Sequence, residues 1–515
     1  MSHKILSIIV LAAAAIVSCS SQQEPRNTPK DPALCFDATK FTTGSITMHD
    51  GETVKFRAYE KIYYVKNVVD SNYQYLNFYV PETSTTSGKG TPILFRNSVG
   101  GYMAGPASQP NANDASGEAL RRGYVVCMPG ARGSNSKVGE LYTGRAPWGL
   151  VDLKAAVRYL RYNDDVMPGD AELIFSDGTS AGGAMSSLLG ATADHPDYDP
   201  YLEQIGAAPA SDKIFGAICY CPIIDLDHAD MAYEWLYKPT NDNIRALNES
   251  QKKVSEQLAA QFDAYIDGLG LANPSTGEKI TSKNYSEYLK SWLIKSIQRA
   301  RNEGADIPSG IGVEFNEDNP FGGMRPDRPK TDGRKPDGAI PDFANSKQLP
   351  GGFNGQDRHS GDFVIGLDLS KYVCYVAGTQ SLKNPPAFDT KDVLQGSLPS
   401  AENKVFGDST GSSVNFTDFS TAENGVELSS EVIKNVHLYN PMYYIGDSKS
   451  HTAPHWYIRH GARDRDISFT ASLNLATKLA NNGLDVNYAL PWNRPHSGDY
   501  NLPDLFEWIG AVMDK

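Results

Sequence analysis

The stretch of sequence that decides the fold is Leu173-Ile-Phe-Ser-Asp-Gly178-Thr-Ser180-Ala-Gly182-Gly183-Ala-Met185. The apolar residues at its start indicate a buried strand, and Ala184-Met185 with Leu188-Leu189 indicate the apolar face of a helix. The turn between them fits G-x-S-x-G, a pattern in which small residues flank a serine with a strained backbone. The order strand, turn, helix predicts that Ser180 is a nucleophile presented at the carboxyl edge of a sheet.

A second match to the same pattern shows that the context matters more than the motif. Gly407-Asp-Ser409-Thr-Gly411 also fits G-x-S-x-G, but no apolar strand precedes it and a Ser/Thr-rich segment follows it. We interpret this second match as a turn.

The rest of the chain predicts the sheet to which the Ser180 strand belongs. Short apolar strands alternate with helical segments from about residue 90, and the alternation resumes near the C-terminus, as is typical of a mostly parallel sheet covered by helices. The predicted strands are 93–95, 124–128, 214–223, 456–460 and 486–490. The predicted helices are 152–161, 467–482 and the final helix 503–513. Around a nucleophile elbow, such a sheet predicts an α/β-hydrolase fold.

Residues 235–440 interrupt this alternation. They contain a charge-rich helical part and then a Pro/Gly/Asp-dense stretch without periodicity. We therefore expect an inserted lid domain over 235–440, between two parts of one hydrolase core, 45–234 and 441–515.

The first residues indicate export. Lys4 precedes an apolar run that is too short for a stable spanning helix, which predicts a signal peptide over residues 1–18. The run ends in Ile16-Val17-Ser18-Cys19, which resembles a bacterial lipobox, so we expect Cys19 to be acylated. Residues 19–44 are then a polar, flexible tether. The expected location is the cell envelope of a Gram-negative bacterium, as a lipoprotein of the outer membrane or facing the periplasm, with the membrane face left open.

Composition excludes several classes of function. The 515 residues carry 61 acidic and 48 basic side chains, a net charge of −13, which argues against a nucleic-acid partner. Apart from Cys19, the five cysteines include no Cys-x-x-Cys pair, so neither a zinc site nor a disulfide framework is indicated, and we expect them to pack in the core. No metal or cofactor is expected, and the oligomeric state stays open.

A serine nucleophile needs a base and an acid that orients the base. His496 follows the last strand and precedes the final helix, which makes it the candidate base among ten histidines. The loop after the penultimate strand offers Asp464 and Asp466, and the residues alone leave both open. We favour Asp464, which comes first after the strand, because Asp466 is the better cap for the following helix. His460 is expected to be buried.

Two backbone N–H groups must stabilise the oxyanion. Ala181, directly after the nucleophile, offers one. The loop 96–102 after an early strand should offer the other, because its glycines let the backbone approach the substrate. We choose Gly101 and keep Gly100, or a plain tight turn, as alternatives.

Five separated motifs, taken together, resemble the bacterial tannases, the gallate esterases typified by those of lactobacilli. The motifs are 152–161, 178–184, 220–223 with 232–235, 385–389, and Arg459-His-Gly-x-x-Asp464-Arg-Asp466. The similarity runs from about residue 45 to the C-terminus. The fungal tannase and feruloyl esterase family is a poorer match, because it has paired cysteines beside the catalytic acid and histidine, where this chain has Arg463 and Pro495.

The resemblance implies an α/β-hydrolase with a large inserted lid and assigns the triad to Ser180, Asp464 and His496. It also implies that Lys383, Glu402 and Asp466 hydrogen-bond the three galloyl hydroxyls. An ammonium and two carboxylates suit phenols, which both donate and accept hydrogen bonds.

We therefore expect an anchored serine esterase that hydrolyses galloyl esters, a small aromatic substrate, through an acyl-enzyme without a cofactor. The alternatives are an esterase for other aromatic acyl groups, such as ferulate or protocatechuate, and a peptidase of the prolyl oligopeptidase type. The peptidase would require a propeller-like repeat before Ser180, and none is present in the sequence. A catalytically dead polyphenol-binding lipoprotein is the third alternative, against which the intact Ser, Asp and His argue.

Overall fold

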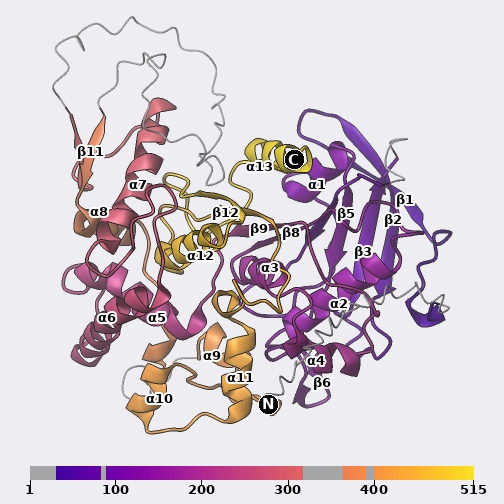
Figure 1. Cartoon of the computed structure of the whole chain (residues 1–515), viewed down its shortest axis with the longest axis horizontal. Helices are drawn as coiled ribbons and strands as arrows, with labels where there is room; N and C mark the ends of the chain where they lie inside the picture. The colour runs from indigo at the N-terminus through magenta and orange to yellow at the C-terminus, as the bar shows by residue number, and fades with distance from the viewer. Residues whose placement is uncertain (1–29, 83–88, 317–362, 390–398) are drawn as a thin grey trace, which may run out of the picture.

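A computed structural model describes residues 30–82, 89–316, 363–389 and 399–515. Its centre is a nine-stranded sheet with the order β1-β2-β3-β5-β4-β8-β9-β12-β13 (Figure 1). The strands are β1 (Thr42–Thr47), β2 (Thr53–Tyr63), β3 (Tyr75–Pro81), β4 (Ile93–Arg96), β5 (Val125–Pro129), β8 (Ile174–Thr179), β9 (Gly216–Tyr220), β12 (His455–Arg459) and β13 (Asp485–Ala489).

The sheet is antiparallel at one end and parallel over the rest. β1, β2, β3 and β5 pair antiparallel in that order, whereas β5, β4, β8, β9, β12 and β13 pair parallel. The carboxyl ends of the parallel strands therefore share one edge, where active sites of such sheets lie. The predicted mostly parallel sheet is confirmed.

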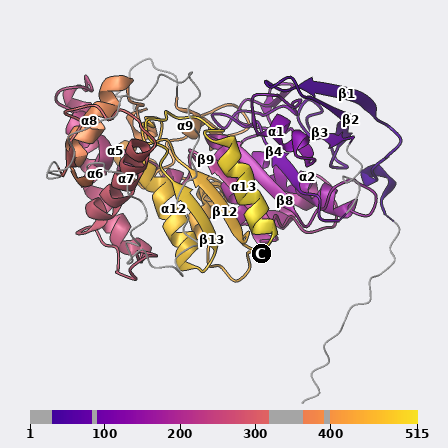
Figure 2. The same ribbon diagram turned by 90° about the horizontal axis from the view of Figure 1, so that it is seen from above.

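Helices cover both faces of this sheet. One apolar core lies between the sheet and α2 (Trp148–Tyr162), α3 (Ala181–Ala191) and α12 (Phe469–Asn481). A second lies under α1 (Ala115–Arg121) and α13 (Leu502–Met513) (Figure 2). Side chains alternate between the two cores, since Val125 and Cys127 of β5 face the first and Val126 and Met128 face the second. The two cores therefore cover both faces of the sheet and leave its carboxyl edge for the site.

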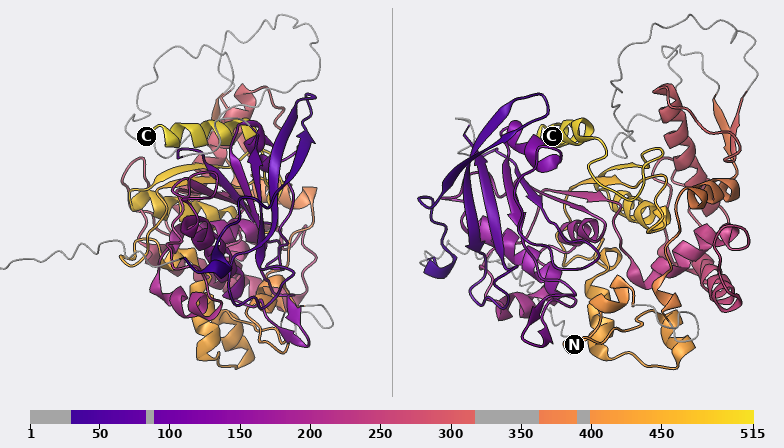
Figure 3. Two further views of the ribbon diagram at one scale, coloured as in Figure 1. Left: turned by 90° about the vertical axis from the view of Figure 1, so that its right-hand side faces the viewer. Right: turned by 180° about the vertical axis from the view of Figure 1, so that it is seen from behind.

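The chain between β9 and β12 forms a separate group of elements. It comprises α5 (Leu226–Tyr237), α6 (Glu249–Leu269), α7 (Tyr285–Asn302), β10 (Val313–Phe315), β11 (Val364–Leu367), α8 (Leu369–Thr379), α9 (Ala401–Val405), α10 (Asp418–Asn424) and α11 (Ser430–Leu438). In its described part this group adds no strand to the nine-stranded sheet. α6, α7 and α8 lie beyond α12, at the end of the molecule opposite β1 (Figures 1 and 2), and Figure 3 shows the same separation from behind.

The second G-x-S-x-G match lies in this group, in a turn after α9. The Gly411 N–H donates to the Asp408 carbonyl at 3.3 Å, and no strand precedes the turn in the described segment that begins at residue 399. The interpretation of residues 407–411 as a turn is confirmed.

The N-terminal segment is ordered earlier than expected. Residues 1–29, with the predicted signal peptide and Cys19, lie outside the described part of the chain. Leu34 and Phe36 are buried in the first core, and the side-chain amide of Asn163 bonds the Leu34 carbonyl at 2.9 Å and the Phe36 N–H at 3.0 Å. The expected flexible tether over 19–44 is therefore wrong for residues 30–44, because two apolar side chains in a polar stretch find distant partners. Among the described helices, none is long and apolar enough to span a membrane.

A buried ion pair ties α2 to the loop before β9. Lys154 Nζ donates to Asp212 Oδ1 at 2.9 Å, and both side chains are fully buried. Arg158 Nε donates to the other Asp212 oxygen at 2.8 Å. Asp212 thus balances two cations, one of which has no access to water.

We expect Asp212→Ala to lower the free energy of unfolding by about 3–5 kcal/mol, because it leaves the Lys154 ammonium buried without its carboxylate. Urea unfolding of the purified chain measures the change. Glu172→Gln is the matched control: Glu172 pairs with Arg161 but is 70% exposed, so its loss should cost less than about 1 kcal/mol. Equal effects of the two variants would contradict this account of the core.

Candidate active site

Ser180 occupies a strained turn between β8 and α3. Its backbone has φ 62° and ψ −125°, a conformation that L-residues rarely adopt. The Ser180 N–H donates to the Tyr220 carbonyl at 2.9 Å, and the Ser180 carbonyl accepts from the Ile223 N–H at 3.2 Å. A Cβ on Gly178 would lie 2.2 Å from the Gly182 carbonyl oxygen, so the turn requires glycine there. The predicted strand, turn and helix are present at the expected residues.

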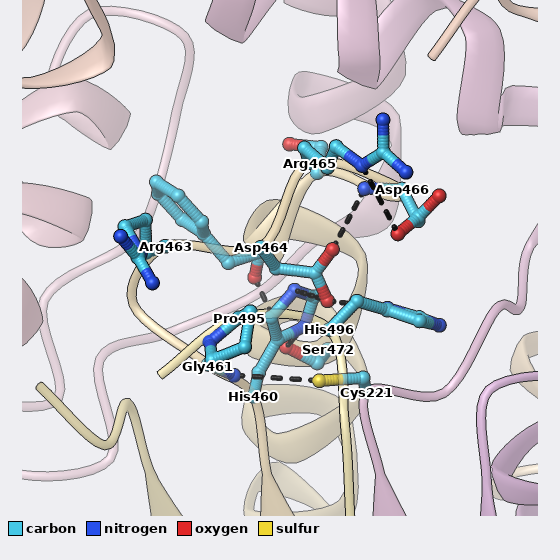
Figure 4. A network of polar contacts seen from close by, with 12 residues as sticks. Cys221, His460, Gly461, Arg463, Asp464, Arg465, Asp466, Ser472, Pro495 and His496 are labelled. Carbon is cyan, nitrogen blue, oxygen red and sulfur yellow. Dashed lines mark hydrogen bonds and ion pairs between the residues drawn. The ribbon is translucent and has the colours of Figure 1, made fainter. Parts of the chain in front are cut away.

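Asp464 and His496 form a direct pair above the same edge of the sheet. His496 Nδ1 lies 2.7 Å from Asp464 Oδ2, and the Asp464 side chain is fully buried (Figure 4). The other Asp464 oxygen accepts the Asp466 N–H at 2.7 Å. His460 is buried, as predicted, with Nε2 3.2 Å from Asp464 Oδ2. The structure therefore separates the two aspartates: Asp464 orients His496, and Asp466 does not.

These contacts set the charges of the pair. Burial alone would raise the pKa of Asp464, but the His496 and His460 rings outweigh it and hold this pKa well below its ordinary value. Burial lowers the pKa of His496, yet the Asp464 carboxylate outweighs burial, and this pKa lies above its ordinary value. Asp464 is thus ionised at neutral pH and stabilises a positive charge on the ring.

The His496 loop packs over the Ser180 turn. His496 Nε2 is buried and has no hydrogen-bond partner among the described residues. A Cβ on Gly498, two residues further on, would lie 2.1 Å from Oγ1 of Thr179, the neighbour of Ser180. No hydrogen bond joins Ser180 Oγ to His496 among the described contacts, but Nε2 is the ring nitrogen left free to take a proton, and its loop lies against the Ser180 turn.

Arg96 fastens this loop to the sheet. Arg96 is the last residue of β4 and forms an ion pair with Asp177 of β8. Its Nη2 also lies 2.7 Å from Oδ2 of Asp499, which belongs to the His496 loop. Burial raises the pKa of Asp177 to about 7, although Arg96 opposes this rise. One guanidinium thus joins the serine strand to the histidine loop.

Tyr500 holds the backbone on both sides of His496. Its hydroxyl donates to the Pro495 carbonyl at 2.6 Å and accepts the Ser497 N–H at 3.1 Å. The same hydroxyl lies 2.9 Å from the Sγ of Cys221, which was expected only to pack in the core. Sequence reasoning missed Tyr500, because an aromatic residue before a helix carries no signal of such a role.

The two predicted oxyanion donors lie close to Ser180 in the chain or in the fold. Ala181 is the first residue of α3, where an N–H has no partner within the helix. Gly101 follows β4, which pairs with β8, and has φ 54°, a left-handed conformation that favours glycine. Their roles as donors stay predictions.

A pocket opens beside the catalytic pair and collects the other predicted residues. Its polar lining is Asp230, Lys383, Glu402 and Asp466, and its empty volume is about 360 Å³ including space open to solvent. Apolar walls come from Ile223, Leu226, Pro385 and Ile467. One oxygen or nitrogen of each of Asp464, Asp466 and His496 lies within 4.8 Å of the others, so the pocket adjoins the pair.

An ion pair organises one wall of this pocket. Lys383 Nζ contacts Glu402 Oε1, and the Glu402 side chain is 4% exposed. Burial lowers the pKa of Lys383, but Glu402 outweighs it and raises this pKa, which keeps the ammonium charged. Glu402 Oε2 is buried without a hydrogen-bond partner in the described part of the chain. A buried, free carboxylate oxygen in a pocket is an acceptor for a ligand hydroxyl.

Asp230 is the pocket residue that sequence reasoning missed. It lies on α5 with Leu226, Ala229 and Tyr233, which line the same pocket. The signal was an acidic residue on the apolar face of a helix, and it is easily taken for an exposed charge.

Comparisons with known proteins agree with this arrangement. The BD-FAE family model, an α/β-hydrolase family of esterases, matches residues 76–302. Esterase LipC of Mycobacterium tuberculosis is 38% identical over 72 residues, 14% of this chain and 18% of that esterase, so the chain aligns with less than a fifth of its length. The crystal structure of Fusobacterium nucleatum tannase is 34% identical, with a TM-score of 0.77, and the match covers 93% of this chain and 99% of that chain.

Tannin acyl hydrolase from Lactobacillus plantarum matches equally well, with 34% identity, a TM-score of 0.77, and coverage of 93% of this chain and 99% of that chain. These likenesses define the class of the protein as a carboxylic ester hydrolase with the α/β-hydrolase fold. The chain belongs to the bacterial tannase family. The predicted family and fold class are thereby confirmed.

The pKa of His496 should respond to its neighbours in a graded way. We expect Asp464→Asn to lower it most, because the main charge that favours the imidazolium is lost. Asp466→Asn should lower it less, and Lys383→Met should raise it, since the ammonium opposes the imidazolium. Histidine-selective NMR titration of the full chain measures these shifts.

His228 is an internal reference in the same spectra. Burial lowers its pKa, but Asp225 and Asp227 outweigh burial and raise it to about 10, so it should not move in these variants. A pKa of His496 that is unchanged in Asp464→Asn would contradict the pairing.

Proposed function

We propose that this protein hydrolyses galloyl esters by a serine mechanism. The observation that carries the proposal is the polar pocket of Lys383, Glu402 and Asp466 beside the Asp464–His496 pair. A pocket with one ammonium and two carboxylates matches an aromatic acyl group with several hydroxyls, because each phenol can donate to a carboxylate and accept from the ammonium.

In the proposed reaction, neutral His496 takes the proton of Ser180 Oγ while this oxygen attacks the ester carbonyl. Asp464 holds the ring and stabilises the imidazolium that forms. The N–H groups of Ala181 and Gly101 bind the oxyanion. His496 then protonates the departing alcohol, and a galloyl ester of Ser180 remains. Water attacks this ester with His496 as base, which releases gallate and free Ser180.

Solved structures of related proteins support an aromatic acyl group. One solved tannin acyl hydrolase is in complex with ethyl gallate, and another is in complex with 3,4-dihydroxybenzoate. The second ligand, 3,4-dihydroxybenzoate, is protocatechuate, which has one ring hydroxyl fewer than gallate. Protocatechuate esters are therefore the favoured alternative substrate. Attachment to the envelope through Cys19 is a separate proposal that rests on the sequence alone.

We expect Ser180→Ala to lower kcat/KM for methyl gallate by about 10⁴-fold or more, because the nucleophile is lost. Spectrophotometric turnover of methyl gallate, methyl ferulate and p-nitrophenyl acetate measures the effect. The control is Ser409→Ala, which removes the serine of the second G-x-S-x-G match and should leave activity unchanged. Turnover of methyl gallate that survives in Ser180→Ala would refute the mechanism.

Lys383→Met should affect gallate selectively. We expect a loss of about 10- to 100-fold in kcat/KM for methyl gallate, the worth of a charged hydrogen bond, and little change for p-nitrophenyl acetate, which has no ring hydroxyl. Lys371→Met is the matched control, because the Lys371 side chain is 66% exposed. An equal loss on both esters in Lys383→Met would mean that Lys383 does not recognise hydroxyls.

A further inference from the structure

A fourth polar side chain lines the acyl pocket and has no part in the mechanism above. Asp230 is 3% exposed and lies on α5, the helix that forms one wall of the pocket. Its Oδ2 accepts the Ala387 N–H at 2.8 Å, which fixes the carboxyl group in place. No other hydrogen bond to this side chain is present among the described residues.

The charges around the pocket distinguish Asp230 from the other two carboxyl groups. Glu402 takes the ion pair with Lys383, the single ammonium of the pocket lining. Asp466 is partly solvated, with its side chain 29% exposed, and lies 3.8 Å from Arg465 Nε. Asp230 has no cation within 4.0 Å in the described part of the chain. A buried carboxyl group without a cation favours its neutral, protonated form.

The groups that face Asp230 reinforce this state. Glu234, on the next turn of α5, pairs with Arg245, whose Nη1 lies 2.8 Å from its Oε2. Burial, together with Glu402 and Glu234, outweighs the Ala387 N–H and Lys383 and raises the pKa of Asp230 to about 8. At neutral pH Asp230 is therefore a carboxylic acid beside the Lys383–Glu402 ion pair.

We propose that Asp230 is a specificity residue of the acyl pocket, where it hydrogen-bonds a ring hydroxyl of the substrate as a neutral carboxylic acid. This inference rests on the proposed function. A protonated carboxyl group donates its O–H and still accepts, a combination that neither Lys383 nor an ionised carboxylate offers. Above its pKa, Asp230 adds a third negative charge to the pocket and loses its donor. Recognition of phenolic rings then weakens while the catalytic pair is unaffected.

The test compares Asp230→Asn and Asp230→Ala with the wild-type enzyme at about pH 6 and about pH 9, on either side of the Asp230 transition. Asparagine keeps the shape and a donor but cannot ionise. We expect Asp230→Asn to stay within about threefold of wild-type kcat/KM for methyl gallate at the lower pH, and Asp230→Ala to lose about tenfold or more. Turnover of p-nitrophenyl acetate should be unchanged in both variants, which also verifies that they fold.

The decisive readout is the ratio of wild-type to Asp230→Asn kcat/KM for methyl gallate as a function of pH. Titration of the substrate phenols and of His496 is common to both enzymes and cancels in the ratio. We expect the ratio to fall as the pH rises through about 8. Asp263→Asn, which changes an exposed aspartate on α6, should follow the wild-type profile throughout.

Two results would overturn the inference. A ratio that is constant with pH would mean that Asp230 does not ionise or does not contact the substrate. Equal losses on methyl gallate and p-nitrophenyl acetate in Asp230→Ala would mean that its role is structural. Failure of the proposed function looks different, because the wild-type enzyme itself would then not turn over methyl gallate.

Discussion

The left-handed backbone of Ser180 is the constraint on which the rest of the site depends. A φ of 62° is costly for a residue with a side chain, and it persists because the end of β9 and the segment after it hold the turn through the Tyr220 carbonyl and the Ile223 N–H. The same two bonds place the serine at the edge where β12 and β13 end. The acid and histidine loops follow those strands, and Arg96 returns the histidine loop to the serine strand. The sheet therefore places these loops, and the chain between β9 and β12 also holds the acid loop, since Tyr237, Tyr372 and Gln380 donate to the carbonyls of Asp464, Ala462 and Arg463.

Catalysis and recognition share one short segment of chain. Asp464 holds His496 from inside the protein, whereas Asp466 lines the pocket that we propose for the acyl group, and the Asp466 N–H donates to Asp464 at 2.7 Å. In the proposed complex, a ring hydroxyl bound at Asp466 would lie close to the group that holds the base. The Asp466 carboxylate also helps to raise the pKa of His496, so a ligand at Asp466 would act on His496 through charge.

Local patterns predicted the parts of this site that depend on local sequence. The strand, the Ser180 turn and the following helix are adjacent in the chain, and their periodicity and glycines are legible without any partner. Local patterns could not decide between Asp464 and Asp466, because the choice depends on which carboxylate contacts a histidine 32 residues away. Lys383 could be named only through the family resemblance, since it lies in a loop of the insertion and its partner Glu402 comes from α9. Asp230 was missed because burial, which gives a carboxyl group its unusual chemistry, is a property of the folded chain.

The most direct test of the account is mass spectrometry of the enzyme stopped by acid during turnover of methyl gallate. The account predicts that the peptide containing Ser180 gains the mass of one galloyl group and that fragmentation places this group on the serine. A matched sample of Ser180→Ala should carry no label. Rapid turnover with no covalent adduct, or with a galloyl group on a different residue, would contradict the central claim that this tannase-family esterase acts through a galloyl ester of Ser180.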